Sequence, residues 1–186
     1  MGIIELIILA IGVSMDAFAV SICKGLSMRK TNVKAMATCG IWFGGFQALM
    51  PLIGFILGSL FASAIQAVDH WVAFALLAFI GISMIKDAYG EEEECDADFS
   101  FKTMFTMALA TSIDALAIGI SLAMVGNVNI ILAITLIGIT TGIISAIGVK
   151  IGGIFGNKFE KKAQIAGGII LIILGIKILL EHLGIL

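Results

Sequence analysis

Two aspartates lie within apolar stretches that are long enough to cross a membrane. Asp16 belongs to residues 14–22 (Ser-Met-Asp-Ala-Phe-Ala-Val-Ser-Ile), and Asp114 belongs to residues 112–120 (Ser-Ile-Asp-Ala-Leu-Ala-Ile-Gly-Ile). The two segments are related by an offset of 98 residues. A carboxylate at mid-bilayer costs about 2.5–3.5 kcal/mol on insertion scales. Its recurrence at matching positions of two related segments indicates a functional site rather than an accident of packing.

Two carboxylates that meet in a low-dielectric interior resist being ionised together. A bound proton or a bound cation relieves this repulsion, so the pair has the minimum equipment for exchanging a cation for protons. Neighbouring side chains add oxygen donors, and oxygen-only ligands favour hard divalent ions such as Mn²⁺, Mg²⁺ or Ca²⁺. A structural polar contact between helices is the alternative interpretation of the aspartates. The predicted metal site comprises Asp16, Asp114, Gln47, Ser14, Ser112, Ser145 and Thr111, with Thr140 and Thr141 also within reach along the chain.

The composition predicts an integral membrane protein. The chain has 186 residues, of which 60% are hydrophobic and 13% charged, and its mean hydropathy is +1.16. Soluble domains carry about 25% charged residues, so this chain lacks the polar surface of a soluble fold. Apolar runs of the length that spans a bilayer as a helix, about 20 residues, occur six times. They cover residues 3–23, 37–60, 70–88, 103–125, 129–150 and 164–183.

The sequence repeat extends beyond the aspartates. At the same offset, three glycines of the first half match three glycines of the second, which pairs Gly40, Gly44 and Gly54 with Gly138, Gly142 and Gly152. Residues 1–90 and 102–186 therefore read as two copies of a three-helix unit, joined by an acidic linker at 91–101. Because three is odd, the second copy must enter the membrane inverted. The predicted fold is all-α, with six transmembrane helices as two inverted repeats in one transmembrane domain, an arrangement of many secondary transporters.

The basic residues predict the orientation. All of them except Lys177 fall in or beside the segments that follow the first, third and fifth apolar runs. The positive-inside rule makes that side cytoplasmic, so both termini are predicted outside and the acidic loop 91–98 inside. This loop is interpreted as a solvated linker, with a metal-collecting patch as the alternative. A net charge of −2 gives no reason to expect nucleic-acid binding.

Other residues carry weaker signals. Cys23, Cys39 and Cys95 show no paired spacing and are predicted to be unpaired thiols. His70 and His182 fall near the predicted outer surface, where single histidines are usually interfacial. No phosphate-binding Gly-x4-Gly-Lys motif occurs, so transport driven by ATP within this chain is not expected, and no cofactor is predicted. Gly-x3-Gly faces serve packing within and between chains alike, which leaves a homo-oligomer open.

Three segments together resemble the bacterial manganese efflux pump family (MntP), within the lysine-exporter-like superfamily of six-helix transporters. They are residues 14–21, residues 43–54 (Phe-Gly-Gly-Phe-Gln-Ala-Leu-Met-Pro-Leu-Ile-Gly) and residues 110–117. The resemblance implies an exporter of the cytoplasmic membrane, with Mn²⁺ as its transported substrate and the family's aspartates at Asp16 and Asp114. Some members carry Glu where this chain has Gln47, so that ligand is neutral here.

The residues alone indicate a secondary transporter with a dicarboxylate site, and only the resemblance implies manganese and export. Cation exit works against the membrane potential by about 2.3 kcal/mol per charge per 100 mV, so inward protons are the expected counter-ion. The alternatives are an exporter of another divalent cation, an amino-acid exporter of the lysine-exporter type, a passive channel and an intramembrane aspartyl protease. The Tyr-Asp and Gly-x-Gly-Asp signatures of that protease are absent. An amino-acid exporter needs a cation for the substrate's carboxylate, and Lys177 is the candidate.

Overall fold

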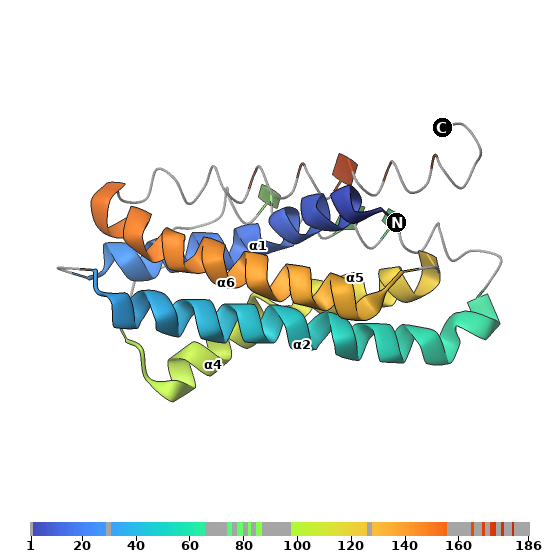
Figure 1. The fold of residues 1–186 in the computed structure, drawn as a ribbon, viewed down its shortest axis with the longest axis horizontal. Coiled ribbons are helices and arrows are strands. Elements are labelled where there is room, and N and C mark those ends of the chain that lie inside the picture. Colours follow the sequence, from blue (N-terminus) through green and yellow to red (C-terminus); the bar gives the residue numbers. More distant parts are fainter. Residues whose placement is uncertain are drawn as a thin grey trace.

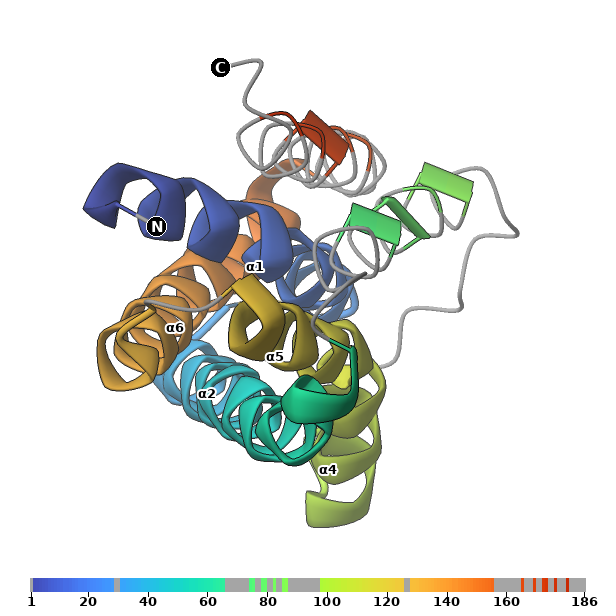
Figure 2. The ribbon, with the colours of Figure 1, turned by 90° about the vertical axis from the view of Figure 1, so that its right-hand side faces the viewer.

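The computed structural model is helical wherever it assigns regular structure. Its five labelled helices are α1 (Ile3–Leu26), α2 (Val33–Ile65), α4 (Phe101–Ala110), α5 (Ile113–Val125) and α6 (Ile130–Phe155). Helices α1, α2, α5 and α6 run side by side along the long axis (Figure 1), and the end-on view places α5 inside the group (Figure 2). The structure describes residues 2–28, 31–65, 74–75, 78–79, 82, 85–86, 98–125, 128–155, 165, 169, 172–173, 176 and 180.

Three helices are long and apolar enough to cross a membrane. These spans are Ile3–Leu26, Val33–Leu60 and Ile130–Ile154, and α4 with α5 forms a fourth candidate that is bent by 41°. The chain is therefore a multi-pass membrane protein. The spans predicted at 70–88 and 164–183 lie mostly outside the described residues, although the described positions within them are helical.

Capping side chains set where the helices begin. The Asn32 Oδ1 atom accepts a hydrogen bond from the Ala35 N–H at 2.7 Å, and the Asn129 Oδ1 atom accepts one from the Leu132 N–H at 3.1 Å. Asparagine at this position satisfies an N–H group that the first helical turn leaves unpaired. Helix α2 consequently starts at Val33 rather than at the predicted residue 37, because the cap and not the apolar run fixes its beginning.

The span predicted as one helix at 103–125 is broken at Thr111 and Ser112. The Thr111 hydroxyl donates to the Met107 carbonyl oxygen at 3.0 Å, and the Ser112 hydroxyl donates to the Leu109 carbonyl oxygen at 3.1 Å. Such bonds from side chains back to the preceding turn often bend helices. Here two of them fall on adjacent residues, and the Ser112 N–H also donates to the Leu109 carbonyl oxygen three residues earlier, at 3.2 Å. The hydropathy of this stretch predicts correctly that it is apolar enough to span a membrane. It does not predict the break, because hydropathy contains no information on the hydrogen bonds of two adjacent hydroxyls.

Glycines bring α2 and α6 into close antiparallel contact. A Cβ atom placed on Gly40 would lie 2.9 Å from the Gly142 carbonyl oxygen, and one placed on Gly44 would lie 2.7 Å from the Gly138 carbonyl oxygen. Small residues permit this backbone approach, which is a common way for helices to associate in lipid. In the sequence repeat, Gly40 corresponds to Gly138 and Gly44 corresponds to Gly142. The contact of Gly40 with Gly142 is therefore the repeat equivalent of the contact of Gly44 with Gly138.

The parallel helix pairs show the same correspondence. Helix α2 packs on α5, where a Cβ atom on Gly54 would lie 3.1 Å from the Ile120 backbone nitrogen. Helix α6 packs on α1, where a Cβ atom on Gly152 would collide with the Ile22 backbone. In the sequence repeat, Gly54 corresponds to Gly152 and Ile22 corresponds to Ile120, so the α2–α5 contact is equivalent to the α1–α6 contact. Equivalent positions of the repeated sequence therefore make equivalent contacts in the four helices α1, α2, α5 and α6.

One end of α1 carries a buried cation. Lys24 has no exposed surface, and its ammonium group donates a hydrogen bond to the Asp98 main-chain oxygen at 2.7 Å. The same nitrogen lies 5.5 Å from the centre of the Phe99 ring, a favourable cation–π distance. Lys24 thus fastens the end of the first helix to the segment that leads into the second half of the chain.

The prediction of three unpaired cysteines was wrong for Cys23. Cys23 is disulfide-bonded in the structure, whereas Cys39 is a free thiol buried beside α1 and α4. Cys95 lies outside the described residues. Spacing along the chain could not reveal the bond, because pairing requires proximity in the fold rather than a short interval in sequence.

Asp98 supports the N-cap of α4, which is Ser100, whose hydroxyl oxygen accepts a hydrogen bond from the Thr103 N–H at 3.4 Å. The Asp98 carboxylate accepts hydrogen bonds from the Thr103 hydroxyl at 2.5 Å, from the Ser100 N–H at 2.8 Å and from the Ser100 hydroxyl at 2.8 Å. These bonds, led by that from Thr103, hold the pKa of the Asp98 carboxyl below its usual value. A depressed folded-state pKa contributes stability above the unfolded-state value of about 3.9 and loses it as pH falls through the folded-state pKa.

We expect Asp98→Ala to lower the melting temperature of the detergent-solubilised protein at pH 7. The difference from the unsubstituted protein should shrink as pH is lowered below about 4, because both proteins then lack the charged cap. Thermal melts of the two proteins across this range measure the effect. A difference that stays constant down to pH 3 would contradict a charge-dependent cap, and Asp98→Asn, which keeps an acceptor oxygen, serves as the matched control.

Candidate functional site

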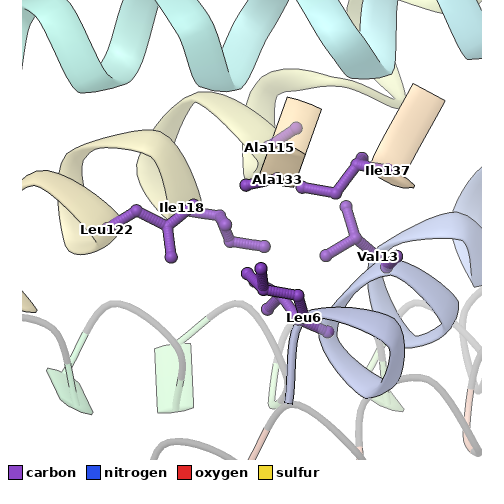
Figure 3. Packing of buried hydrophobic residues seen from close by; sticks show 9 residues of the cluster. Leu6, Val13, Ala115, Ile118, Leu122, Ala133 and Ile137 are labelled. Atoms are coloured by element: carbon purple, nitrogen blue, oxygen red, sulfur yellow. The ribbon is translucent and has the colours of Figure 1, made fainter. Parts of the chain in front are cut away.

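Two apolar clusters occupy successive levels of the helix bundle. The first joins α1, α5 and α6 and consists of Leu6, Leu9, Ala10, Val13, Ala115, Ile118, Leu122, Ala133 and Ile137 (Figure 3). The second joins α1, α2, α4 and α6 and consists of Ala17, Ala35, Cys39, Phe43, Met104, Ala108 and Val149. The two clusters bracket a short interval along α1, the α4–α5 span and α6.

Polar residues fill the interval between the clusters on every helix. On α1 they fall between Val13 and Ala17, and on α6 between Ile137 and Val149. On the broken span they fall between Ala108 and Ala115. On α2 the polar residue is Gln47, one turn beyond Phe43. We call this set the polar layer: Ser14, Asp16, Gln47, Thr111, Ser112, Asp114, Thr141 and Ser145.

The polar layer is buried. Its six neutral members are all classed as buried, and Ser14, Gln47, Ser112, Thr141 and Ser145 have no exposed surface. Both carboxylate oxygens of Asp114 are buried as well, whereas Asp16 is half-buried. The two carboxylates lie close enough to repel each other electrostatically. The seven residues of the predicted site therefore lie in the interval between the two clusters, on α1, α2, the α4–α5 span and α6. Direct interactions join Gln47 to Thr111, and Asp114 to Asp16 and Gln47.

Several buried oxygens of the layer have no hydrogen-bond partner within the described part of the chain. They are both carboxylate oxygens of Asp114, Gln47 Oε1, Thr141 Oγ1 and Ser145 Oγ. Leaving a buried polar group unsatisfied costs about 1–3 kcal/mol, so native folds keep few of them. A concentration of such atoms at one level, all of them oxygens, has the donor chemistry of a cation site.

The break between α4 and α5 orients Gln47. The Gln47 Nε2 atom donates to the Thr111 carbonyl oxygen at 2.8 Å, at the point where the helix is interrupted. Because a carbonyl oxygen can only accept, the amide must turn its NH₂ group towards Thr111 and its Oε1 atom away. Gln47, which lies beside Asp114, therefore contributes a buried oxygen to the layer.

The remaining hydroxyls differ in how they use their protons. Ser14 donates to the Ile11 carbonyl oxygen at 2.8 Å, and Thr111 and Ser112 also bond their own helical turns. Thr141 and Ser145 do not. The sequence left Thr140 and Thr141 equally plausible, but Thr141 is fully buried while Thr140 is half-buried. The spacing of Thr141 four residues before Ser145, which puts both on one helix face, is the sequence signal that could have separated them.

Within the described residues no group of three or more His, Cys, Asp or Glu side chains is close enough to hold a metal ion. The described part of the layer contains two carboxylates, Asp16 and Asp114, and its other members carry neutral oxygens. Apolar spanning helices around buried carboxylates define a multi-pass membrane protein with an ionisable interior, a class in which such residues mark ion and substrate pathways.

Comparison with known proteins narrows the class to a family. The family model described as "Putative manganese efflux pump" matches residues 30–179. Two curated relatives named "Putative manganese efflux pump MntP" match the whole of this chain. The one from Desulfitobacterium hafniense is 55% identical and is covered over 98% of its length. The one from Acetivibrio thermocellus is 56% identical and is covered over 94% of its length. A Campylobacter jejuni relative of that name is 54% identical over 98% of both chains. The chain belongs to the manganese efflux pump family. No solved structure matches it.

Proposed function

We propose that the protein exports Mn²⁺ across the cytoplasmic membrane in exchange for protons, through a site in the polar layer. The names of its relatives support the substrate and the direction. The observation that carries the mechanism is the buried Asp114 carboxylate, which lies beside Gln47 and within electrostatic range of Asp16. An intramembrane carboxylate in this situation is a functional site by default.

The proposed ligands are all oxygens. Asp16 and Asp114 supply charge, Gln47 supplies its amide oxygen, and Ser145 supplies its hydroxyl. Ser14, Thr111 and Ser112 retain lone pairs after donating their protons to the backbone. Such a set suits a hard divalent ion. Two carboxylates offset the two charges of Mn²⁺, so the occupied site is neutral and its burial is tolerable.

Charge balance determines the exchange. When Mn²⁺ leaves, two carboxylates at short range cannot both remain ionised in a buried layer, and each takes up a proton. One Mn²⁺ therefore moves out for two protons that move in. The transported charges cancel, so the membrane potential neither opposes nor drives the cycle, and the proton gradient supplies the driving force.

The proposed architecture is the six-helix inverted repeat, with residues 1–90 and 102–186 as its halves and 91–101 as the linker. The contacts Gly40–Gly142 and Gly44–Gly138 between α2 and α6 are equivalent to each other in the sequence repeat, which supports a two-fold relation between the halves. Such a relation allows two similar states, each open to one side. The distribution of Lys and Arg supports an orientation with both termini outside and loop 91–98 in the cytoplasm.

Proteoliposomes test the coupling. With an acidic lumen and a more alkaline bath, Mn²⁺ added outside should accumulate in vesicles that contain the protein, and the lumen should lose two protons per ion. A potential imposed with potassium and valinomycin should leave the rate unchanged. Mn²⁺ flux that ignores the pH gradient would show that proton coupling is wrong, and protein-free liposomes under the same gradient provide the control.

Competition measures which ion the site takes. Mg²⁺ and Ca²⁺ share the preference of Mn²⁺ for oxygen, and each is added to the same vesicles in increasing amounts, starting at the concentration of Mn²⁺. Suppression of Mn²⁺ flux by an equimolar amount of either would favour a general divalent-cation exporter. The amino-acid exporter remains the second candidate. Its predicted carboxylate-binding cation, Lys177, lies outside the described residues, and the buried cation within them, Lys24, lies two helical turns from Asp16 along α1.

A further inference from the structure

We propose that Thr141 is a further ligand of the transported divalent cation, and that its hydroxyl oxygen acts together with that of Ser145 one helical turn away. This inference rests on the ion site proposed above and adds a residue to it. Both hydroxyl oxygens are buried, both residues have no exposed surface, and neither oxygen has a hydrogen-bond partner among the described residues. The two side chains lie on one face of α6.

Other hydroxyls in this chain show what a helical Ser or Thr does when it has no other role. Ser21, Ser121 and Thr135 each donate to the carbonyl oxygen four residues earlier, at 2.6, 3.1 and 2.7 Å. That bond is available to Thr141 and Ser145 as well, and neither makes it. A hydroxyl that forgoes this bond in a buried position remains unsatisfied at a cost, which indicates that its oxygen is held ready for a ligand.

The position of Thr141 along α6 matches the level of the aspartates. One turn earlier, Ile137 packs in the first apolar cluster with Val13 and Ala115, the immediate neighbours of Ser14 and Asp114. Two turns later, Val149 packs in the second cluster with Ala17 and Ala108. Thr141 and Ser145 therefore occupy the same interval between the clusters as the carboxylates do.

The chemistry of α6 explains why hydroxyls are used there. Between residues 130 and 149 this helix has no charged side chain. Asp16 and Asp114 already neutralise a divalent ion, so a third carboxylate would leave a buried excess charge. Neutral hydroxyl oxygens fill further coordination positions without that cost. Gly142, adjacent to Thr141, allows α6 to approach Gly40 on α2, the helix that carries Gln47.

Isosteric substitution tests the assignment. Thr141→Val removes the hydroxyl and keeps the shape, and Mn²⁺ affinity of the purified full chain, measured by titration calorimetry, should fall about tenfold. Thr141→Ser should restore it. Thr140→Val is the matched control, because it makes the same change one residue away on a half-buried side chain, and it should leave the affinity unchanged.

The metal-free melting temperature distinguishes a ligand from a structural hydroxyl. If the Thr141 oxygen is unsatisfied until the ion binds, Thr141→Val should raise this temperature while it weakens Mn²⁺ binding. If Thr141→Val lowers the metal-free melting temperature, the role of Thr141 as a ligand is wrong. It is also wrong if Thr141→Val leaves Mn²⁺ affinity unchanged while Asp114→Asn is inactive, and in both cases the ion site itself stands. If Asp114→Asn binds Mn²⁺ as well as the unsubstituted protein, the proposed ion site itself is wrong.

Discussion

Asp114→Asn is expected to abolish Mn²⁺ export. The substitution preserves the shape of a buried side chain and removes both the charge that binds the ion and the group that carries the returning proton. Breaking a buried charge pair by removing one partner costs about 3–5 kcal/mol, so Mn²⁺ affinity should fall at least a hundredfold. The measurement is intracellular manganese in Mn²⁺-challenged cells that lack their own exporter and express either the unsubstituted chain or the variant.

Asp16→Asn should fail in the same way, because one carboxylate alone cannot neutralise a divalent ion. Asp98→Asn is the matched control, since the Asp98 carboxylate is exposed and outside the polar layer. Immunoblots of isolated membranes must show equal amounts of all variants. Normal export by Asp114→Asn would mean that the repeated aspartates are structural. If the unsubstituted chain leaves cell manganese unchanged, the manganese assignment fails first.

The helices at residues 3–26, 33–65 and 130–155 follow closely from the apolar runs in the sequence. Length and hydropathy decide this outcome, because a backbone in lipid must satisfy its own hydrogen bonds and a helix does so. The repeat offset placed Asp16 and Asp114 at matching positions, and the structure puts both in one layer with Gln47. The role of these residues as metal ligands remains a prediction.

The break in the α4–α5 span, the burial of Thr141 and the disulfide bond at Cys23 depend on contacts in the fold that cannot be read from the sequence. Two adjacent hydroxyls, Thr111 and Ser112, break a span whose hydropathy is continuous, and the break is what orients Gln47. The sequence offered Thr140 and Thr141 alike, and the burial of Thr141 in the structure shows which of the two faces the interior. The disulfide bond at Cys23 depends on proximity in the fold, which the spacing of cysteines along the chain does not reveal.

Gly152→Ala is expected to separate α1 from α6. A Cβ atom at this position would collide with the Ile22 backbone, which cannot rotate aside as a side chain would. Overpacking of a tight interface costs about 1–3 kcal/mol, which corresponds to a fall of roughly 2–12 °C in melting temperature for a chain of this size. Thermal melts of the detergent-solubilised protein measure the change.

Gly45→Ala is the matched control for this substitution. Gly45 also lies in a long helix, but nothing is within 4 Å of the position that its Cβ atom would occupy. Alanine is the better helix former by about 0.5–1 kcal/mol, so this variant should melt at the same temperature as the unsubstituted protein or slightly higher. A Gly152→Ala protein as stable as Gly45→Ala would contradict the close α1–α6 contact.

The same experiment examines the relation between the two halves. Gly54 contacts α5 at the position that corresponds to Gly152 under the repeat offset, and its Cβ atom would collide with the Leu116 carbonyl oxygen. If the α2–α5 and α1–α6 pairs are equivalent, Gly54→Ala should destabilise the protein about as much as Gly152→Ala. A large difference between them would show that the two halves, although alike in sequence, do not contribute equally to the fold.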